Sequence, residues 1–209
     1  MIEINNVSKK FKNVTVLDSI NMILKENSIY AFVGHNGSGK SVLLKLICCF
    51  YIPTNGTILI DKINYNETNS FPNNIRAFIE SPNFIPDLTG LENLQLLAKI
   101  QNKISDKEII DALEVVNLLE EKTKKYCEYS LGMKQKLGIA SVLMENPKIM
   151  ILDEPFNGID EKSKKQIIDY IKMIKKDKII IITSHIKEEI NSIADIIYEF
   201  NNGNAELIK

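Results

Sequence analysis

The strongest chemical signal in the sequence is a glycine-rich octapeptide that matches the phosphate-binding P-loop pattern Gly-x-x-x-x-Gly-Lys-Ser. It reads Gly34-His35-Asn36-Gly37-Ser38-Gly39-Lys40-Ser41. Glycines at these places let backbone N–H groups surround phosphate oxygens, and the start of a helix adds partial positive charge. Lys40 is expected to reach the β and γ phosphates, Ser41 to bind Mg²⁺, and the adjoining Val42 to contact the nucleotide.

Two carboxylates supply a second signal. Asp153 and Glu154 directly follow the apolar run at residues 149–152, and open α/β sheets bind their ligands where such strands end. Asp153 can hold Mg²⁺ through water, while Glu154 can act as the general base that polarises an attacking water. On its own the pair could be a capped strand end. The presence of a P-loop in the same chain favours the catalytic interpretation.

These groups need elements that position them. Residues 28–33 are apolar and predict a strand before the P-loop, and the spacing of residues 41–50 predicts a buried helix after it. Residues 56–60 predict a further strand, and residues 64–74 a polar loop. Two runs, 149–152 and 179–183, are too apolar to have a solvent face and flank a lysine-rich helix, which is typical of a parallel sheet.

The middle of the chain has helix signals in place of strand patterns. Thr89 with Glu92, and Ser105 with Glu108, have capping-box spacing, so residues 86–146 are predicted to be mainly helical. Residues 196–208 predict a terminal hairpin around Asn202-Gly203. The predicted fold is an α/β P-loop (RecA-like) core with N-terminal antiparallel strands and an inserted α-helical subdomain. We expect one domain over residues 1–209, with a core lobe at about 1–85 and 147–209 and the helical subdomain at about 86–146.

The amino-acid composition excludes some classes of function. The 209 residues are 44% hydrophobic, enough for a sizeable core, and 27 acidic residues nearly cancel 26 basic ones. No overall positive field exists to hold a nucleic-acid backbone, and Arg76 is the only arginine, so nucleic acid is not an expected partner. Cys48, Cys49 and Cys127 do not form a metal or disulfide pattern and are expected to be buried, inert thiols in a reducing cytosol.

Membrane segments are not expected from the sequence. The N-terminal residues lack the basic start and apolar stretch of a signal peptide. No window approaches the roughly 18 uninterrupted apolar residues that a spanning helix needs. If the protein acts at a membrane, another chain must take it there.

The order of motifs resembles the ATP-binding cassette (ABC) ATPases over nearly the whole chain. The family's signature, usually Leu-Ser-Gly-Gly-Gln, corresponds to Tyr129-Ser130-Leu131-Gly132-Met133, in which only Ser130 and Gly132 match. The resemblance implies that these two clamp the γ phosphate of ATP bound to a second subunit, although alone the segment is typical of a helix N-cap. It also implies that Asp160 lies at the dimer seam of a D-loop.

The same resemblance assigns roles to two more side chains, His185 and Phe11. His185 matches the switch histidine, which contacts the γ phosphate and positions the water. Phe11 stands where the family places an aromatic that stacks on adenine, with a core phenylalanine as the alternative. His35 occupies a free P-loop position.

The most informative departure is Glu80, in Ile79-Glu80-Ser81-Pro82, where most family members carry a glutamine that touches Mg²⁺. With the Tyr-Ser-Leu-Gly-Met signature, it resembles the branch associated with bacitracin-type and lantibiotic-type peptide export and self-protection; sequence drift is the alternative. A carboxylate there would bind Mg²⁺ more strongly than an amide. We hypothesise that Glu80 links metal occupancy to movement of the following loop against a membrane partner.

The resemblance implies a Mg-ATP-dependent ATPase that forms a homo- or heterodimer around ATP and drives a separate transmembrane permease from the cytoplasmic face of the membrane. Rival hypotheses are a soluble, non-transport cassette ATPase, an importer subunit, and an ordinary P-loop kinase or GTPase. The signature helix and the switch histidine argue against the kinase or GTPase. The transported compound is not specified by the sequence.

Overall fold

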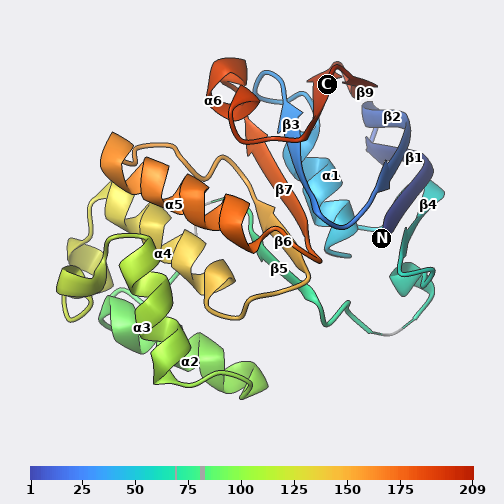
Figure 1. Ribbon diagram of the computed structural model, residues 1–209. Helices are drawn as coiled ribbons and strands as arrows, with labels where there is room; N and C mark the ends of the chain where they lie inside the picture. The colour runs from blue at the N-terminus through green and yellow to red at the C-terminus, as the bar shows by residue number, and fades with distance from the viewer. Residues whose placement is uncertain (69, 81–82) are drawn as a thin grey trace. The chain divides into compact units, whose positions relative to one another are not determined.

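The computed structural model describes residues 1–68, 70–80 and 83–209, so Ser81 and Pro82 lie outside the described residues (Figure 1). The chain divides into two compact units. The first comprises Met1–Ile79, Lys148–Glu154 and Lys175–Lys209, and the second comprises Glu80–Pro147 and Pro155–Ile174. Residues 155–174, which the sequence placed in the core lobe, thus group with the helical unit.

The first unit contains a three-stranded antiparallel sheet in the order β2-β1-β4, coloured blue to teal in Figure 1. Its strands are β1 (Ile2–Phe11), β2 (Val14–Leu24) and β4 (Asn55–Ile60). The second half of β2 alternates between buried and exposed residues, with Ile20, Met22 and Leu24 facing the core. This period of two is typical of a sheet with one solvated face.

A six-stranded sheet in the order β5-β6-β7-β3-β8-β9 is the framework of the first unit. The strands β5 (Ile75–Phe78), β6 (Ile149–Leu152), β7 (Ile179–Ser184), β3 (Ser28–Val33) and β8 (Ile196–Asn201) run parallel, and β9 (Asn204–Leu207) is antiparallel to β8. All residues of β6 and β7 are buried. Parallel order brings the carboxyl ends of β3, β6 and β7 to one edge.

Helix α1 (Lys40–Ile47) contributes four fully buried side chains to a hydrophobic core that also takes residues from both sheets. The helix is shorter than the predicted 41–50. Cys49 adopts a left-handed φ of 60°, and the N–H of Phe50 turns back to the carbonyl of Lys45 at 2.8 Å. This turn satisfies a terminal carbonyl and stops the helix. A short helix, α6 (Lys187–Asn191), follows β7.

The second unit is helical, as the sequence predicted for residues 86–146. It contains α2 (Gly90–Gln101), α3 (Asp106–Val115), α4 (Leu131–Leu143) and α5 (Glu161–Ile174). Single 3-10 turns occur at Leu119–Glu121 and Tyr126–Glu128. Both predicted capping boxes are present, Thr89 with Glu92 and Ser105 with Glu108. Among the helices of the described residues, none is both long and apolar enough to cross a membrane.

Several expectations need correction. The predicted loop at 64–74 contains a 3-10 turn at Tyr65–Glu67, and β5 was not predicted at all. The cysteines differ from one another: Cys48 is buried, Cys49 is half-buried, and Cys127, in the 3-10 turn Tyr126–Glu128, is exposed. Burial raises the pKa of the Cys48 thiol to about 12.

Candidate nucleotide and metal site

The P-loop connects β3 to α1 and is built around the buried ammonium of Lys40. Lys40 is 5% exposed, and its Nζ donates hydrogen bonds to the carbonyl oxygens of Gly34 at 2.7 Å and His35 at 3.2 Å. Burial lowers the pKa of Lys40, and the nearby carboxylates of Glu154 and Asp153 partly oppose this shift. The lysine therefore lies beneath the loop, at the start of a helix whose first N–H groups have no intrahelical partner.

The acidic pair at the end of β6 is held by a residue of the neighbouring strand. Thr183 in β7 donates from its hydroxyl to Oδ1 of Asp153 at 2.5 Å. The same hydroxyl oxygen accepts the backbone N–H of Glu154 at 2.8 Å. Asp153 and Thr183 are 5% and 0% exposed. The β6–β7 register, with Leu152 beside Ile182, places the residues that follow next to each other.

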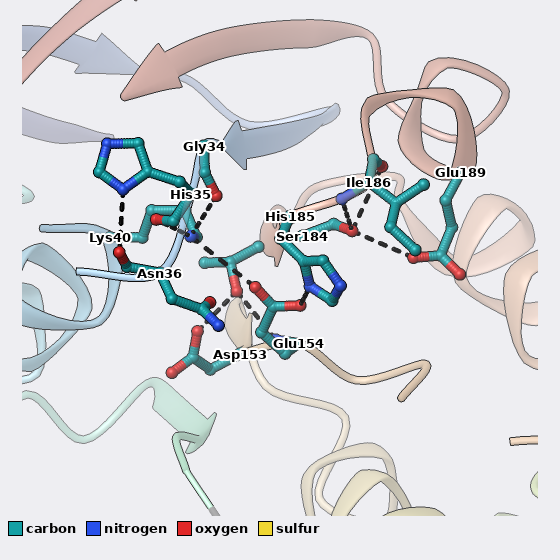
Figure 2. Close-up of polar contacts among 11 residues, drawn as sticks. Gly34, His35, Asn36, Lys40, Asp153, Glu154, Ser184, His185, Ile186 and Glu189 are labelled. Atoms are coloured by element: carbon teal, nitrogen blue, oxygen red, sulfur yellow. Dashed lines mark hydrogen bonds and ion pairs between the residues drawn. The ribbon is translucent and has the colours of Figure 1, made fainter. Parts of the chain in front are cut away.

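Glu154 contacts both His185 and Lys40. Its Oε2 accepts a hydrogen bond from Nδ1 of His185 at 2.7 Å, and its Oε1 lies 3.7 Å from Nζ of Lys40 (Figure 2). Glu154 has a left-handed φ of 47°. A proton on His185 Nδ1 is required because a carboxylate only accepts, which leaves Nε2 on the far side of the ring for another contact. The structure thus brings Lys40, Asp153, Glu154 and His185 together.

Two of these residues, Lys40 and Glu154, line a pocket of about 160 Å³ together with Val16, Asn36, Gly37, Gly39, Ser41 and Val42. Beside it, the hydroxyl oxygen of Ser38 is buried and makes no hydrogen bond among the described residues. Buried polar atoms are rarely left without a partner, so this hydroxyl fits a phosphate oxygen. Ser41 and Asp153 offer hard oxygen donors, the type that Mg²⁺ prefers. This small number of protein ligands is consistent with Mg²⁺, because that metal also takes phosphate oxygens and water as ligands.

The signature segment lies in the second unit. Ser130 is exposed and caps α4 by accepting the N–H of Met133 at 3.3 Å. A Cβ at Gly132 would lie 2.3 Å from the carbonyl oxygen of Gly158, so only glycine lets the helix start approach the D-loop. Nearby, Nζ of Lys136 in α4 donates to Oδ2 of Asp160 at 2.7 Å. This hydrogen bond, with the N–H of Ser163, holds the pKa of Asp160 well below its usual range.

Comparison with known proteins decides the family. The family model described as ABC transporter matches residues 17–157. The uncharacterized ABC transporter ATP-binding protein YybJ of Bacillus subtilis is 41% identical over 207 residues, which are 99% of this chain and 95% of YybJ. The chain belongs to the ABC transporter ATP-binding family. It is the ATP-binding and ATP-hydrolysing subunit of an ABC transporter.

This ABC ATPase is also similar to a second curated relative and to a solved structure. The bacitracin transport ATP-binding protein BcrA of Enterococcus faecalis is 39% identical over 97% of this chain and 67% of its own length. A solved dimeric ATP-binding cassette, in a post-hydrolysis state bound to ADP and Pi, has a TM-score of 0.89 at 26% identity, with coverage of 99% of this chain and 97% of that one. The predicted α/β P-loop fold is confirmed.

Two further predicted residues of the ABC ATPase, Phe11 and His35, belong to the first unit and are not among the residues that line this pocket. Phe11 is 38% exposed and makes an edge-on contact with Tyr51, their ring centroids being 5.3 Å apart. His35 is exposed, and its Nδ1 donates to the carbonyl of Asn36 at 2.9 Å. Glu80 is exposed, with a left-handed φ of 62°, and belongs to the second unit. Adenine stacking by Phe11 and metal binding by Glu80 stay predictions.

The sequence analysis missed two polar side chains, Thr183 and Asn93, whose hydrogen bonds hold neighbouring segments in place. Thr183 holds the acidic pair, and the signal available was a threonine at the end of an apolar strand. In the second unit, Asn93 is 2% exposed and holds the segment before α2: its side-chain oxygen accepts the N–H of Ile85 at 2.8 Å, and its amide donates to the carbonyls of Ile85 at 3.1 Å and Thr89 at 3.0 Å. A polar residue on an otherwise apolar helix face was the signal there.

Proposed function

We propose that this ABC ATPase hydrolyses Mg-ATP in the pocket of the P-loop and thereby powers the export of a peptide antibiotic or a similar amphiphile through a separate membrane permease. The observation that carries the proposal is the convergence of Lys40, Asp153, Glu154 and His185 at one edge of the parallel sheet, beside a pocket whose loop fits phosphate. The relatives' names support the substrate class.

Each residue has a role that follows from its surroundings. Backbone N–H groups of the P-loop and the Lys40 ammonium hold the phosphates and stabilise negative charge that develops on them. Ser41 and Asp153 hold Mg²⁺, which when bound neutralises phosphate charge. Glu154 accepts a proton from the attacking water, and His185, held by Glu154, presents its Nε2 toward the γ phosphate. Phe11 stacks on the adenine, and Glu80 adds a carboxylate to the metal site.

A second subunit completes each site in this proposal. The solved relative with ADP and Pi is dimeric, and Ser130 is exposed at the N-terminus of α4, where the helix dipole favours an anion. We infer that Ser130 and Gly132 of one subunit contact the γ phosphate held by the P-loop of the other, with Asp160 at the seam. ATP then joins the subunits, and its hydrolysis lets them separate.

The work of transport needs a partner. We propose that the permease docks on the second unit from the cytoplasmic side of the membrane, at the segment that follows Glu80. Residues 83–88 of this segment are tied to the lead-in of the signature: the N–H of Tyr126 donates to the carbonyl of Leu88 at 2.9 Å, and the N–H of Cys127 to that of Pro86 at 3.0 Å. Movement of the docking segment would therefore reach Ser130.

The first test uses Glu154→Gln, which removes the charge but keeps the shape of the side chain. In light scattering, this variant is expected to be monomeric with ADP and dimeric with ATP, in Na⁺ without Mg²⁺. Adding Ser130→Arg should abolish the dimer by placing a bulky cation at the seam, whereas Lys187→Arg on α6 should leave it intact. A persistent monomer would contradict a composite homodimeric site and point to a heterodimer.

The second test concerns the substrate. The chain is expressed with its cognate permease in a sensitive host, and the inhibitory concentrations of bacitracin and of a lantibiotic are measured. Resistance should rise, and both Lys40→Ala and Glu154→Gln should remove it while the proteins remain present at wild-type levels. If resistance survives in these variants, or never appears although the ATPase is active, the export assignment is wrong.

A further inference from the structure

We propose that Thr183 is a positioning residue for ATP hydrolysis, because its single hydroxyl sets the orientation of both the metal-binding carboxylate and the catalytic base. The inference rests on the roles proposed above for Asp153 and Glu154. It adds a residue of β7 that the P-loop and the acidic pair do not contain.

The two hydrogen bonds of Thr183 use its hydroxyl in both directions. The O–H donates to Oδ1 of Asp153 at 2.5 Å, and the oxygen accepts the N–H of Glu154 at 2.8 Å. A hydroxyl offers one donor and two acceptor positions, so both contacts can be present at once. Since Thr183 is 0% exposed and threonine is stiff about χ1 in a strand, the hydroxyl has little freedom to turn away.

For Asp153 the consequence is a fixed carboxylate. A hydrogen bond to an ionised acceptor is stronger than one between neutral groups, and this one occupies Oδ1. The contact uses Oδ1, so in the metal role proposed for Asp153 the other oxygen, Oδ2, is the one left for Mg²⁺ or its water. Without it, the carboxylate could rotate about χ2, a torsion with a broad energy profile, and Mg²⁺ would lose a pre-organised partner.

For Glu154 the consequence concerns the backbone. Its φ of 47° lies in the left-handed region, which non-glycine residues adopt only when neighbours hold them there. The hydrogen bond from its N–H to Thr183 is such a restraint. It keeps the side chain where Oε2 meets His185 at 2.7 Å and Oε1 lies 3.7 Å from Lys40. Release of the N–H would let the carboxylate move away from the attacking water.

The neighbouring hydroxyl provides a matched control. Ser184 is also buried and stands one residue further along β7. Its Oγ accepts the N–H of Ile186 at 3.0 Å and donates to Glu189 at 3.1 Å, so its contacts lead to α6 and not to the acidic pair (Figure 2). Loss of a buried hydroxyl at the end of β7 can thus be compared at two adjacent positions.

The experiment compares Thr183→Val, which keeps the shape and removes the hydroxyl, with Thr183→Ser, which keeps the hydroxyl, and with Ser184→Ala. Steady-state ATPase kinetics are measured together with the binding of a fluorescent N-methylanthraniloyl ATP, with and without Mg²⁺. Thr183→Val should lower kcat about ten- to a hundredfold, the effect of one charge-assisted hydrogen bond on a transition state. It should also raise the Mg²⁺ concentration needed for half-maximal strengthening of nucleotide binding.

Binding of the nucleotide without Mg²⁺ should stay within about twofold of wild type, because the P-loop is untouched. Thr183→Ser and Ser184→Ala should keep kcat and Mg²⁺ dependence within about threefold of wild type, as expected for changes that spare the interaction. Thr183→Cys, which has a weak S–H donor in place of the O–H, should fall between Ser and Val and gives a second reading if Thr183→Val fails to fold.

Two outcomes overturn the inference: wild-type kcat and Mg²⁺ dependence in Thr183→Val, or an equal loss in Thr183→Ser and Thr183→Val, which would indicate packing alone. Asp153→Asn separates the inference from the function on which it rests. If Asp153→Asn keeps the wild-type Mg²⁺ response, the metal role of Asp153 is wrong. If it loses the response while Thr183→Val retains it, only the role of Thr183 is refuted.

Discussion

Gly90→Ala is predicted to damage the signature segment from a distance along the chain. Gly90 is the first residue of α2, and a Cβ built there would lie 2.1 Å from the hydroxyl oxygen of Tyr129 and 3.0 Å from its Cζ. Tyr129 is 4% exposed, and its hydroxyl donates to the carbonyl of Glu121 at 2.9 Å. The ring must therefore move, and Ser130 follows it directly in the chain.

The magnitude can be assembled from these contacts. Overpacking costs about 1–3 kcal/mol and the lost hydrogen bond about 0.5–1.5 kcal/mol, while replacing glycine in a helix returns at most about 1 kcal/mol. The net destabilisation is about 0.5–4.5 kcal/mol, and for a chain of this size each kcal/mol lowers the melting temperature by about 2–4 °C. The ATPase rate should fall as well, because the start of α4 is displaced.

The assay is thermal unfolding followed by circular dichroism, in a double-mutant cycle with Tyr129→Phe. Removing the hydroxyl relieves the shortest contact, so the cycle should show a favourable coupling of about 1 kcal/mol between the two substitutions. Lys99→Ala, at an exposed position of the same helix, should change stability by no more than about 0.5 kcal/mol. Gly90→Ala with wild-type stability, or a cycle without favourable coupling between the two substitutions, would refute the reasoning.

Three further predictions test other contacts. Asn93→Ala should cost about 2–4 kcal/mol in urea unfolding, because it leaves buried backbone groups unpaired; a loss under 1 kcal/mol would contradict this. The pKa of Asp160 is held down by Lys136, so its stabilisation is present above the unfolded pKa of about 3.9 and is lost as the pH falls through the lower folded pKa. The stability gap between wild type and Asp160→Asn should thus be constant from about pH 5 to 8 and shrink below about pH 4; a gap that grows on acidification would be incompatible with the ion pair. Finally, a thiol reagent at neutral pH should label the exposed Cys127 quickly and leave Cys48 unmodified until the protein unfolds; equal labelling rates would show that Cys48 is accessible.

The parts of the site that the sequence predicts are local. The P-loop is contiguous, and the strand before it and the helix after it have unambiguous apolar patterns, so Lys40 could be placed from its neighbours alone. Asp153 and Glu154 were recognisable because they end an apolar run. The two capping boxes could be predicted for the same reason, since donor and acceptor are three residues apart.

What the sequence could not supply depends on register between distant segments. The role of Thr183 arises only because β6 and β7 pair with Leu152 beside Ile182. The ion pair of Lys136 with Asp160 joins residues that no short pattern relates. β5 was missed because it has four residues, one of which is Arg76. Tertiary pairing, and not local preference, makes that segment a strand.

The strand order of the six-stranded sheet also bears on how the chain is synthesised. β3, which leads into the P-loop, is hydrogen-bonded on one side to β7 and on the other to β8. Both partners are made about 150 residues after it, so the nascent chain carries an apolar strand with two open edges for most of translation. Such a strand is a site for mispairing. Closure of the sheet is therefore expected to be slow and late, because β3 cannot pair with both neighbours until β8 has been made.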